Sequence, residues 1–135
     1  MARPRFRITA HTADVRLLVW GDTEQELLAH AVAGAMRLAL DRDVSGLPIA
    51  WRRVRGRVRD LASTLVATVN EALFLLYSRR EVTVAVAWSE GHVSLGALGL
   101  AAGVEPEREI KAATFHALQP RVAGRRRSAV LVLDV

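Results

Sequence analysis

Two stretches of the chain repeat their apolar residues at the spacing of an amphipathic helix. The first covers residues 23–40 and begins with a capping box, in which the Thr23 hydroxyl and the Glu26 carboxylate can satisfy free amides of the first turn. Asp60 is the expected cap of the second helix. The apolar positions that return to one face are Leu28, Val32, Ala35, Met36 and Ala39 in the first helix, and Leu61, Leu65, Val69, Leu73 and Leu76 in the second.

The other apolar residues alternate with polar ones or form short runs, which indicates β-strands. Ser89-Glu90-Gly91 separates two such runs and predicts a hairpin. Residues 109–118 fit a helix as well, but their alternation favours a strand. The expected strands cover residues 5–9, 15–20, 51–59, 81–88, 92–100, 109–118 and 128–135. These elements predict a single α+β domain, residues 1–135, in which two amphipathic helices pack on a β-sheet of about six to seven strands.

The expected strand at residues 51–59 carries arginine at every second position from Arg53 to Arg59. Such a face is typical of a solvated strand, or of a charged edge that discourages aggregation. A strip that binds phosphates is the alternative. We favour it less, because no aromatic residue on which a base could stack is interleaved with the arginines. The three arginines at residues 125–127 are likewise expected to form a solvated turn.

The amino-acid composition excludes several kinds of site and suggests where the protein acts. The 135 residues include no cysteine, which excludes disulfides, thiolate metal sites and cysteine nucleophiles. We expect neither a secretory signal nor a membrane span, and therefore a cytoplasmic protein. The net charge of +5 suggests an acidic partner.

Of 19 basic residues only Lys111 is a lysine. Because arginine does not replace a compact, mobile ammonium, Lys111 is a candidate functional residue.

Two aspartates stand at the ends of expected strands. Asp14 precedes the strand at residues 15–20, and Asp134 closes the strand at residues 128–135. An aspartate in the first position can simply form a turn by binding its own backbone. Two carboxylates at the ends of adjacent strands, together with carbonyl oxygens, would instead form the hard oxygen set that calcium or magnesium requires.

Several short motifs occur together in this chain and in one known family. They are Phe6-x-x-x-x-His11-Thr12-Ala13-Asp14-Val15, Trp20-Gly21-Asp22-Thr23, Asp60-Leu61 with Asn70-Glu71-Ala72-Leu73, Ile110-Lys111-Ala112-Ala113-Thr114-Phe115-His116 and Leu133-Asp134-Val135. In this order, and over almost the full length, the chain resembles the archeases, small accessory proteins of the tRNA-splicing RNA ligase that joins RNA ends using GTP. Any one motif alone is weak, but their joint occurrence is specific.

The resemblance implies a single α+β domain and a protein that is not itself an enzyme. It implies that the protein helps the ligase to become guanylylated and to turn over repeatedly, and that it reaches RNA through the ligase. It also implies a bound divalent cation, which we expect to be calcium, with magnesium or manganese as alternatives. The implied metal ligands are Asp14, Asp134 and the main-chain oxygen of Val135. The implied functional surface comprises Lys111, His11 and His116.

Two interpretations from other classes stay open on the residues alone. A metal-dependent hydrolase would use His11, Asp14 and His116, although two aspartates without an activated serine or cysteine make a thin catalytic set. A basic RNA-binding module would use the arginine strand and the turn at residues 125–127. Its affinity for RNA would fall steeply with rising salt in the absence of any ligase.

Overall fold

The structure, a computed structural model, describes residues 5–10, 14–55, 60–89, 91–115 and 120–135. This part of the chain forms two helices, α1 (Glu24–Leu40) and α2 (Leu61–Arg79), and eight strands. The strands are β1 (Phe6–Ala10), β2 (Asp14–Gly21), β3 (Ala50–Arg53), β4 (Glu81–Ser89), β5 (His92–Gly99), β6 (Ala112–Phe115), β7 (Arg121–Ala123) and β8 (Arg126–Asp134).

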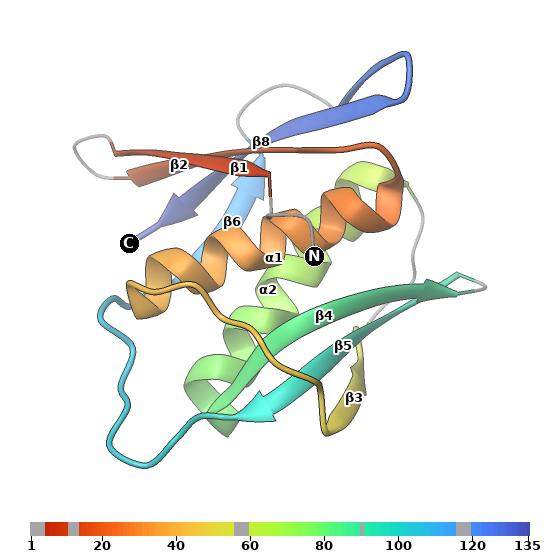
Figure 1. The fold of residues 1–135 in the computed structure, drawn as a ribbon. Coiled ribbons are helices and arrows are strands. Elements are labelled where there is room, and N and C mark those ends of the chain that lie inside the picture. Colours follow the sequence, from red (N-terminus) through yellow and green to blue (C-terminus); the bar gives the residue numbers. More distant parts are fainter. Residues whose placement is uncertain (1–4, 11–13, 56–59, 90, 116–119) are drawn as a thin grey trace.

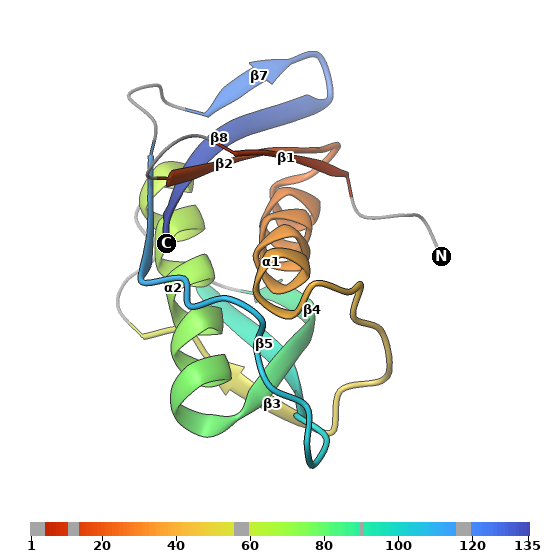
Figure 2. The ribbon, with the colours of Figure 1, turned by 90° about the vertical axis from the view of Figure 1, so that its left-hand side faces the viewer.

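The elements form three layers, with both helices between two antiparallel sheets (Figures 1 and 2). The β8 sheet has the strand order β1-β2-β8-β6, and β7 also pairs with β8. The β5 sheet has the order β3-β5-β4. α1 packs against β2 on one side and β4 on the other, and α2 packs against α1, β4 and β6. The predicted α+β class is confirmed, whereas two sheets replace the expected single one.

Two sheets are needed because the helices are apolar around most of their circumference, so that one sheet would leave apolar surface in water. Alternate residues of β2 and β8 point toward the helices from one side, and alternate residues of β5 do so from the other. α1 approaches β2 closely at Gly34, where an added Cβ would lie 2.6 Å from the Leu17 Cδ1 atom. The fully buried large side chains of this core include Leu17, Leu27, Leu28, Met36, Leu65, Leu76, Leu95, Leu131 and Leu133.

Both predicted helix caps are present. The Thr23 hydroxyl accepts from the Glu26 amide at 3.0 Å, and an Asp60 carboxylate oxygen accepts from the Ser63 amide at 2.7 Å. The Glu26 side chain differs from the capping-box prediction. Its carboxylate accepts from the Arg5 guanidinium at 2.8 Å, because a cation at the start of β1 offers it a charge-assisted bond.

β3 ends at Arg53, so Val54 and Arg55 do not continue the expected arginine strand, and the last part of that prediction, residues 56–59, lies outside the described residues. Val54 follows as a buried residue whose amide donates to the Val93 carbonyl, and the chain bends at Arg55 toward α2. Arg53 and Arg55 therefore do not share one strand face. The last strands also differ from the prediction: β6 begins at Ala112 and not at residue 109, and residues 121–123 form β7 where a turn was expected. The end of the first of these expected strands, residues 116–118, lies outside the described residues.

α2 corrects the expectation that no segment has the dimensions of a membrane span. By length and composition it is long and apolar enough to cross one, although a single such helix is weak evidence. Half of that segment is buried inside the molecule, between the two sheets. It also holds buried polar residues, including Thr68, whose hydroxyl donates to the Thr64 carbonyl at 2.6 Å. These are the properties of a core helix.

Candidate functional site where β2, β6 and β8 meet

Three strand ends converge at one corner of the β8 sheet. Asp14 is the first residue of β2 and Asp134 the last of β8, and the two are register partners in the antiparallel pair. On its other edge, Asp134 is paired with Ala112, the first residue of β6. Directly opposite residues share a face of the sheet, with Cβ atoms about 4.5–5.5 Å apart. The register thus brings together the two aspartates that the sequence placed at neighbouring strand ends.

This aspartate pair points away from the helices. Val15 and Leu133, the next residues along the two strands, are buried against the core, and side chains alternate between faces along a strand. Asp14 is half-buried and Asp134 is exposed. Two like charges opposed in this way repel each other. Within the described ranges neither carboxylate has an ion-pair partner within 4.0 Å, so this repulsion is not relieved there.

The donor atoms at this corner are oxygens. Calcium and magnesium take carboxylate and carbonyl oxygens, and calcium needs six to eight of them, part of which can be water. The two carboxylates and the main-chain oxygen of the exposed residue Val135 are donor atoms of the kind that such an ion binds. The described residues contain no group of three or more His, Cys, Asp or Glu side chains that could hold a metal.

Lys111 is held beside the aspartate pair by its backbone. Its amide donates to the Asp134 carbonyl at 2.7 Å, immediately before β6 begins. The residue is exposed and lines a pocket of about 460 Å³, the Lys111 pocket, between α2 and the segment that leads into β6. The other residues lining this pocket are Asn70, Leu73, Phe74, Tyr77, Ser78, Glu109, Ile110 and Ala112.

Two polar residues of α2 fix the segment that carries Lys111. The Asn70 side chain donates to the Ala113 carbonyl at 3.1 Å and accepts from the Ala113 amide at 2.8 Å. The Tyr77 hydroxyl donates to the Arg108 carbonyl at 2.6 Å and accepts from the Ile110 amide at 2.8 Å. Burial raises the pKa of this hydroxyl, which keeps it protonated and able to donate.

Sequence reasoning had not assigned these positioning roles. Asn70 belongs to one of the quoted motifs, and Tyr77 follows it by seven residues, which is two helical turns. A shared polar face inside an otherwise apolar helix is the signal that could have found them. The two histidines proposed for the functional surface, His11 and His116, lie outside the described residues.

Comparison with known proteins identifies the family of the chain. The model of the archease protein family (MTH1598/TM1083) matches residues 6–135. The chain belongs to the archease family. The curated protein archease of Methanosarcina mazei is 31% identical over 146 residues, which cover 97% of this chain and 96% of that protein. The resemblance found in the short motifs is thereby confirmed.

Two solved structures share the archease fold. The solution structure of protein 1598 of Methanobacterium thermoautotrophicum has a TM-score of 0.70 at 20% identity and covers 98% of this chain and 100% of its own. The crystal structure of an archease from Thermotoga maritima, described as a possible chaperone, has a TM-score of 0.62 at 20% identity. That match covers 100% of this chain and 98% of the other.

Proposed function

We propose that this archease is a non-catalytic accessory factor of the GTP-dependent tRNA-splicing RNA ligase, and that it promotes guanylylation and multiple turnover of that enzyme. The observation that supports this most is the in-register pair of Asp14 and Asp134, whose strand end is bound by the Lys111 amide. Membership of the family supports the same role, as does the description of a structural relative as a possible chaperone. We place the activity in the cytoplasm, with RNA reached through the ligase and no membrane involved.

A divalent cation belongs to this proposal. Asp14, Asp134 and the main-chain oxygen of Val135 would hold it, with calcium expected and magnesium or manganese as alternatives. Such an ion would neutralise the opposed carboxylates and offer a positive charge to acidic or phosphate groups of the partner. These residues would hold the ion at a strand end, on a face of the β8 sheet that the helices do not cover.

Lys111 is the residue we propose to contact the partner. Its backbone is fixed from both sides, by the Asp134 carbonyl and by the contacts of Asn70 and Tyr77 with the adjoining segment. Its exposed ammonium sits on a flexible stem that can reach a phosphate or a carboxylate of the ligase. His11 and His116 remain proposed neighbours of this surface.

Single-turnover guanylylation of the cognate ligase with GTP tests the proposal. We expect the parent protein to accelerate the reaction, and Lys111→Ala to fold normally but lose most of this stimulation. Lys111→Arg should be impaired too, because a bulky planar guanidinium does not take the place of an ammonium.

Arg125→Ala is the matched control. It removes one exposed cation at the β7–β8 turn, roughly 25–30 Å along β8 from Asp134. The accessory role fails if the parent protein gives no stimulation. The placement of the surface fails if both Lys111 variants stimulate as well as Arg125→Ala does.

A further inference from the structure

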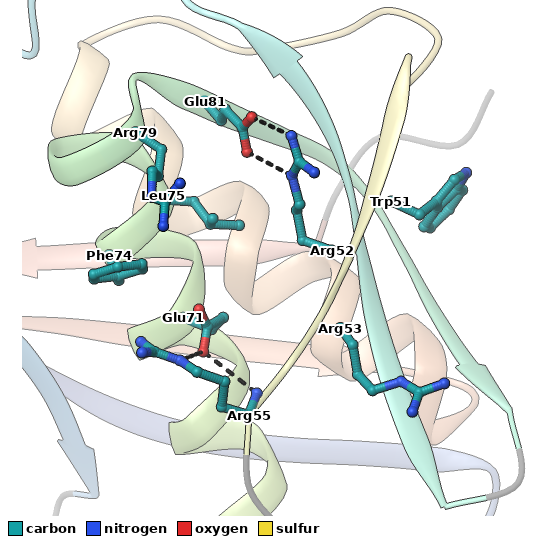
Figure 3. Close-up of a pocket in the computed structure, with 9 residues that line it drawn as sticks. All are labelled: Trp51, Arg52, Arg53, Arg55, Glu71, Phe74, Leu75, Arg79 and Glu81. Carbon is teal, nitrogen blue, oxygen red and sulfur yellow. Dashed lines mark hydrogen bonds and ion pairs between the residues drawn. The ribbon is translucent and has the colours of Figure 1, made fainter.

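A second pocket, of about 410 Å³, lies between β3 and α2 (Figure 3). Four arginines line it, namely Arg52, Arg53, Arg55 and Arg79, and we call it the arginine pocket. Arg52 and Arg55 reach toward α2 and the start of β4, whereas Arg79 approaches from α2 itself. The volume lies within the range of sites that take one small ligand, so it would admit a nucleotide but not a nucleic-acid duplex.

Two of the four arginines hold the pocket together. The Arg52 guanidinium binds the Glu81 carboxylate through two hydrogen bonds of 2.7 and 3.0 Å. The Arg55 Nε atom donates to Glu71 at 2.9 Å, and the Glu71 side chain is only 9% exposed. These bonds join β3 and the residues after it to α2 and β4. The two acids of the pocket are therefore already engaged by arginines of the same chain.

The other two arginines leave a surplus of positive charge. Neither Arg53 nor Arg79 has an ion-pair partner within 4.0 Å in the part of the chain that the structure describes. Arg53 points away from α2 at the rim of the pocket, whereas Arg79 lies beside the Arg52–Glu81 pair (Figure 3). Four guanidinium groups stand against two carboxylates, so the pocket attracts an anion.

Two exposed aromatic rings accompany these cations. Trp51 is 52% exposed and Phe74 is 36% exposed, and both line the arginine pocket. The Arg55 guanidinium lies over the Phe74 ring, 4.4 Å from its centroid. The sequence pattern had argued against a phosphate-binding strip because aromatic residues were not interleaved with the arginines. The fold supplies them from α2 and from β3 itself.

Phe74 also lines the Lys111 pocket. One ring on α2 therefore borders two hollows, one with an excess of arginine and the other with the single lysine. Cations on both sides of an exposed aromatic ring are the arrangement by which proteins track a single-stranded nucleic acid, with phosphates on the cations and bases on the ring.

We propose that the arginine pocket binds single-stranded RNA directly. Arg79 would contact a phosphate on the α2 side of β3 and Arg53 a phosphate on its other side, with bases stacked on Phe74 and on Trp51, respectively (Figure 3). An acidic protein segment would also satisfy the charge, but it would not use two half-exposed aromatic rings. This site goes beyond the accessory role, in which RNA is reached through the ligase, and its test needs no ligase.

The test is fluorescence anisotropy of a labelled oligouridine of about twelve nucleotides, titrated with the protein between about 50 and 200 mM salt. The variant Arg53→Glu/Arg79→Glu reverses the two unpaired cations. Its control, Arg42→Glu/Arg125→Glu, makes the same charge change at exposed arginines outside both pockets. We expect the pocket variant to weaken binding about tenfold more than the control. We also expect the slope of log K against log salt to flatten by about 1.4, at about 0.7 for each lost phosphate contact on a single strand.

Phe74→Leu separates stacking from charge. It retains an apolar side chain on α2, and we expect about tenfold weaker RNA binding with an unchanged salt slope. The proposal is overturned if the parent protein does not bind the RNA, or if the pocket variant and its control weaken binding equally. It is also overturned if polyglutamate of equal charge competes as well as oligouridine and Phe74→Leu binds RNA normally, because the pocket would then be a site for an acidic protein.

Discussion

Two pairs of acidic residues in this molecule differ in whether their charges are neutralised by arginines of the same chain. In the arginine pocket, Glu71 and Glu81 each accept hydrogen bonds from an arginine of the same chain. At the end of β8, Asp14 and Asp134 face each other in register, without an ion-pair partner among the described residues. The glutamates join elements of the fold, whereas the aspartates repel each other across the sheet.

This difference separates charges that hold the fold from charges offered to a ligand. A carboxylate that is bonded inside the molecule stabilises it, and removing either partner leaves a group unsatisfied. Two like charges held opposite each other destabilise the folded state slightly unless a bound cation neutralises them. Stability measurements with and without a cation should therefore distinguish the two kinds of acid.

The largest effect should come from the cation itself. Calcium at a hundred times its dissociation constant should raise the free energy of unfolding of the parent protein by about 2.7 kcal/mol. Asp134→Asn should lose most of this gain, and without calcium it should be as stable as the parent or slightly more so. Thermal or urea unfolding with and without calcium measures both quantities.

Asp43→Asn, a change at an exposed loop aspartate, is the control, and it should keep the full stabilisation by calcium. If calcium stabilises both variants equally, the proposal that the cation binds at Asp134 is contradicted.

Glu71→Ala should act without any cation. It removes the acceptor of the Arg55 Nε–H group, and we expect a loss of about 1–3 kcal/mol in the free energy of unfolding. Urea denaturation near pH 7 measures this loss. Glu107→Ala changes an exposed acid outside the pocket, and its effect should stay within about 0.5 kcal/mol. If the two variants are equally stable, the Glu71 contact does not hold the fold.

The smallest effect concerns the Arg52–Glu81 pair and pH. Hydrogen bonding to the Arg52 guanidinium lowers the pKa of the Glu81 carboxyl below its ordinary value of 4.5. A depressed pKa in the folded state gives stability that is present above this ordinary value and is lost as pH falls through the folded-state pKa. Arg52→Gln should thus lose less stability than the parent on acidification below pH 4.5, by at most about 1 kcal/mol for a pair this near the surface. Parallel acid unfolding curves for the two proteins would contradict this.

The local parts of the fold could be predicted from the sequence. Both helices and their caps follow from apolar spacing and from Thr23 and Asp60, because these signals act within a few residues. The hairpin of β4 and β5 follows from alternation around a turn. β7 could not be predicted, because residues 121–123 are exposed and pair with β8 without an apolar pattern of their own.

Long-range contacts explain what the sequence left open at the candidate site. The pattern placed Asp14 and Asp134 at strand ends, but the register that opposes them depends on how the strands pair. The polar face of α2 could single out Asn70 and Tyr77, but it does not reveal their partners, because these contacts cross between distant elements. Arg55 is exposed as predicted, but its contacts with Phe74 and Glu71 of α2 could not be predicted for the same reason.

The position of β8 has a consequence for how the chain folds. This strand lies inside its sheet, bound by β2 on one edge and by β6 and β7 on the other. β2 precedes it by nearly the whole sequence, so their pairing closes a very long loop and should be slow. β4 and β5 are joined by a short turn and can pair early. We therefore expect the corner that holds the two aspartates to be among the last parts of the molecule to form during synthesis, so that a nascent chain would offer this surface to a partner only once β8 has been made.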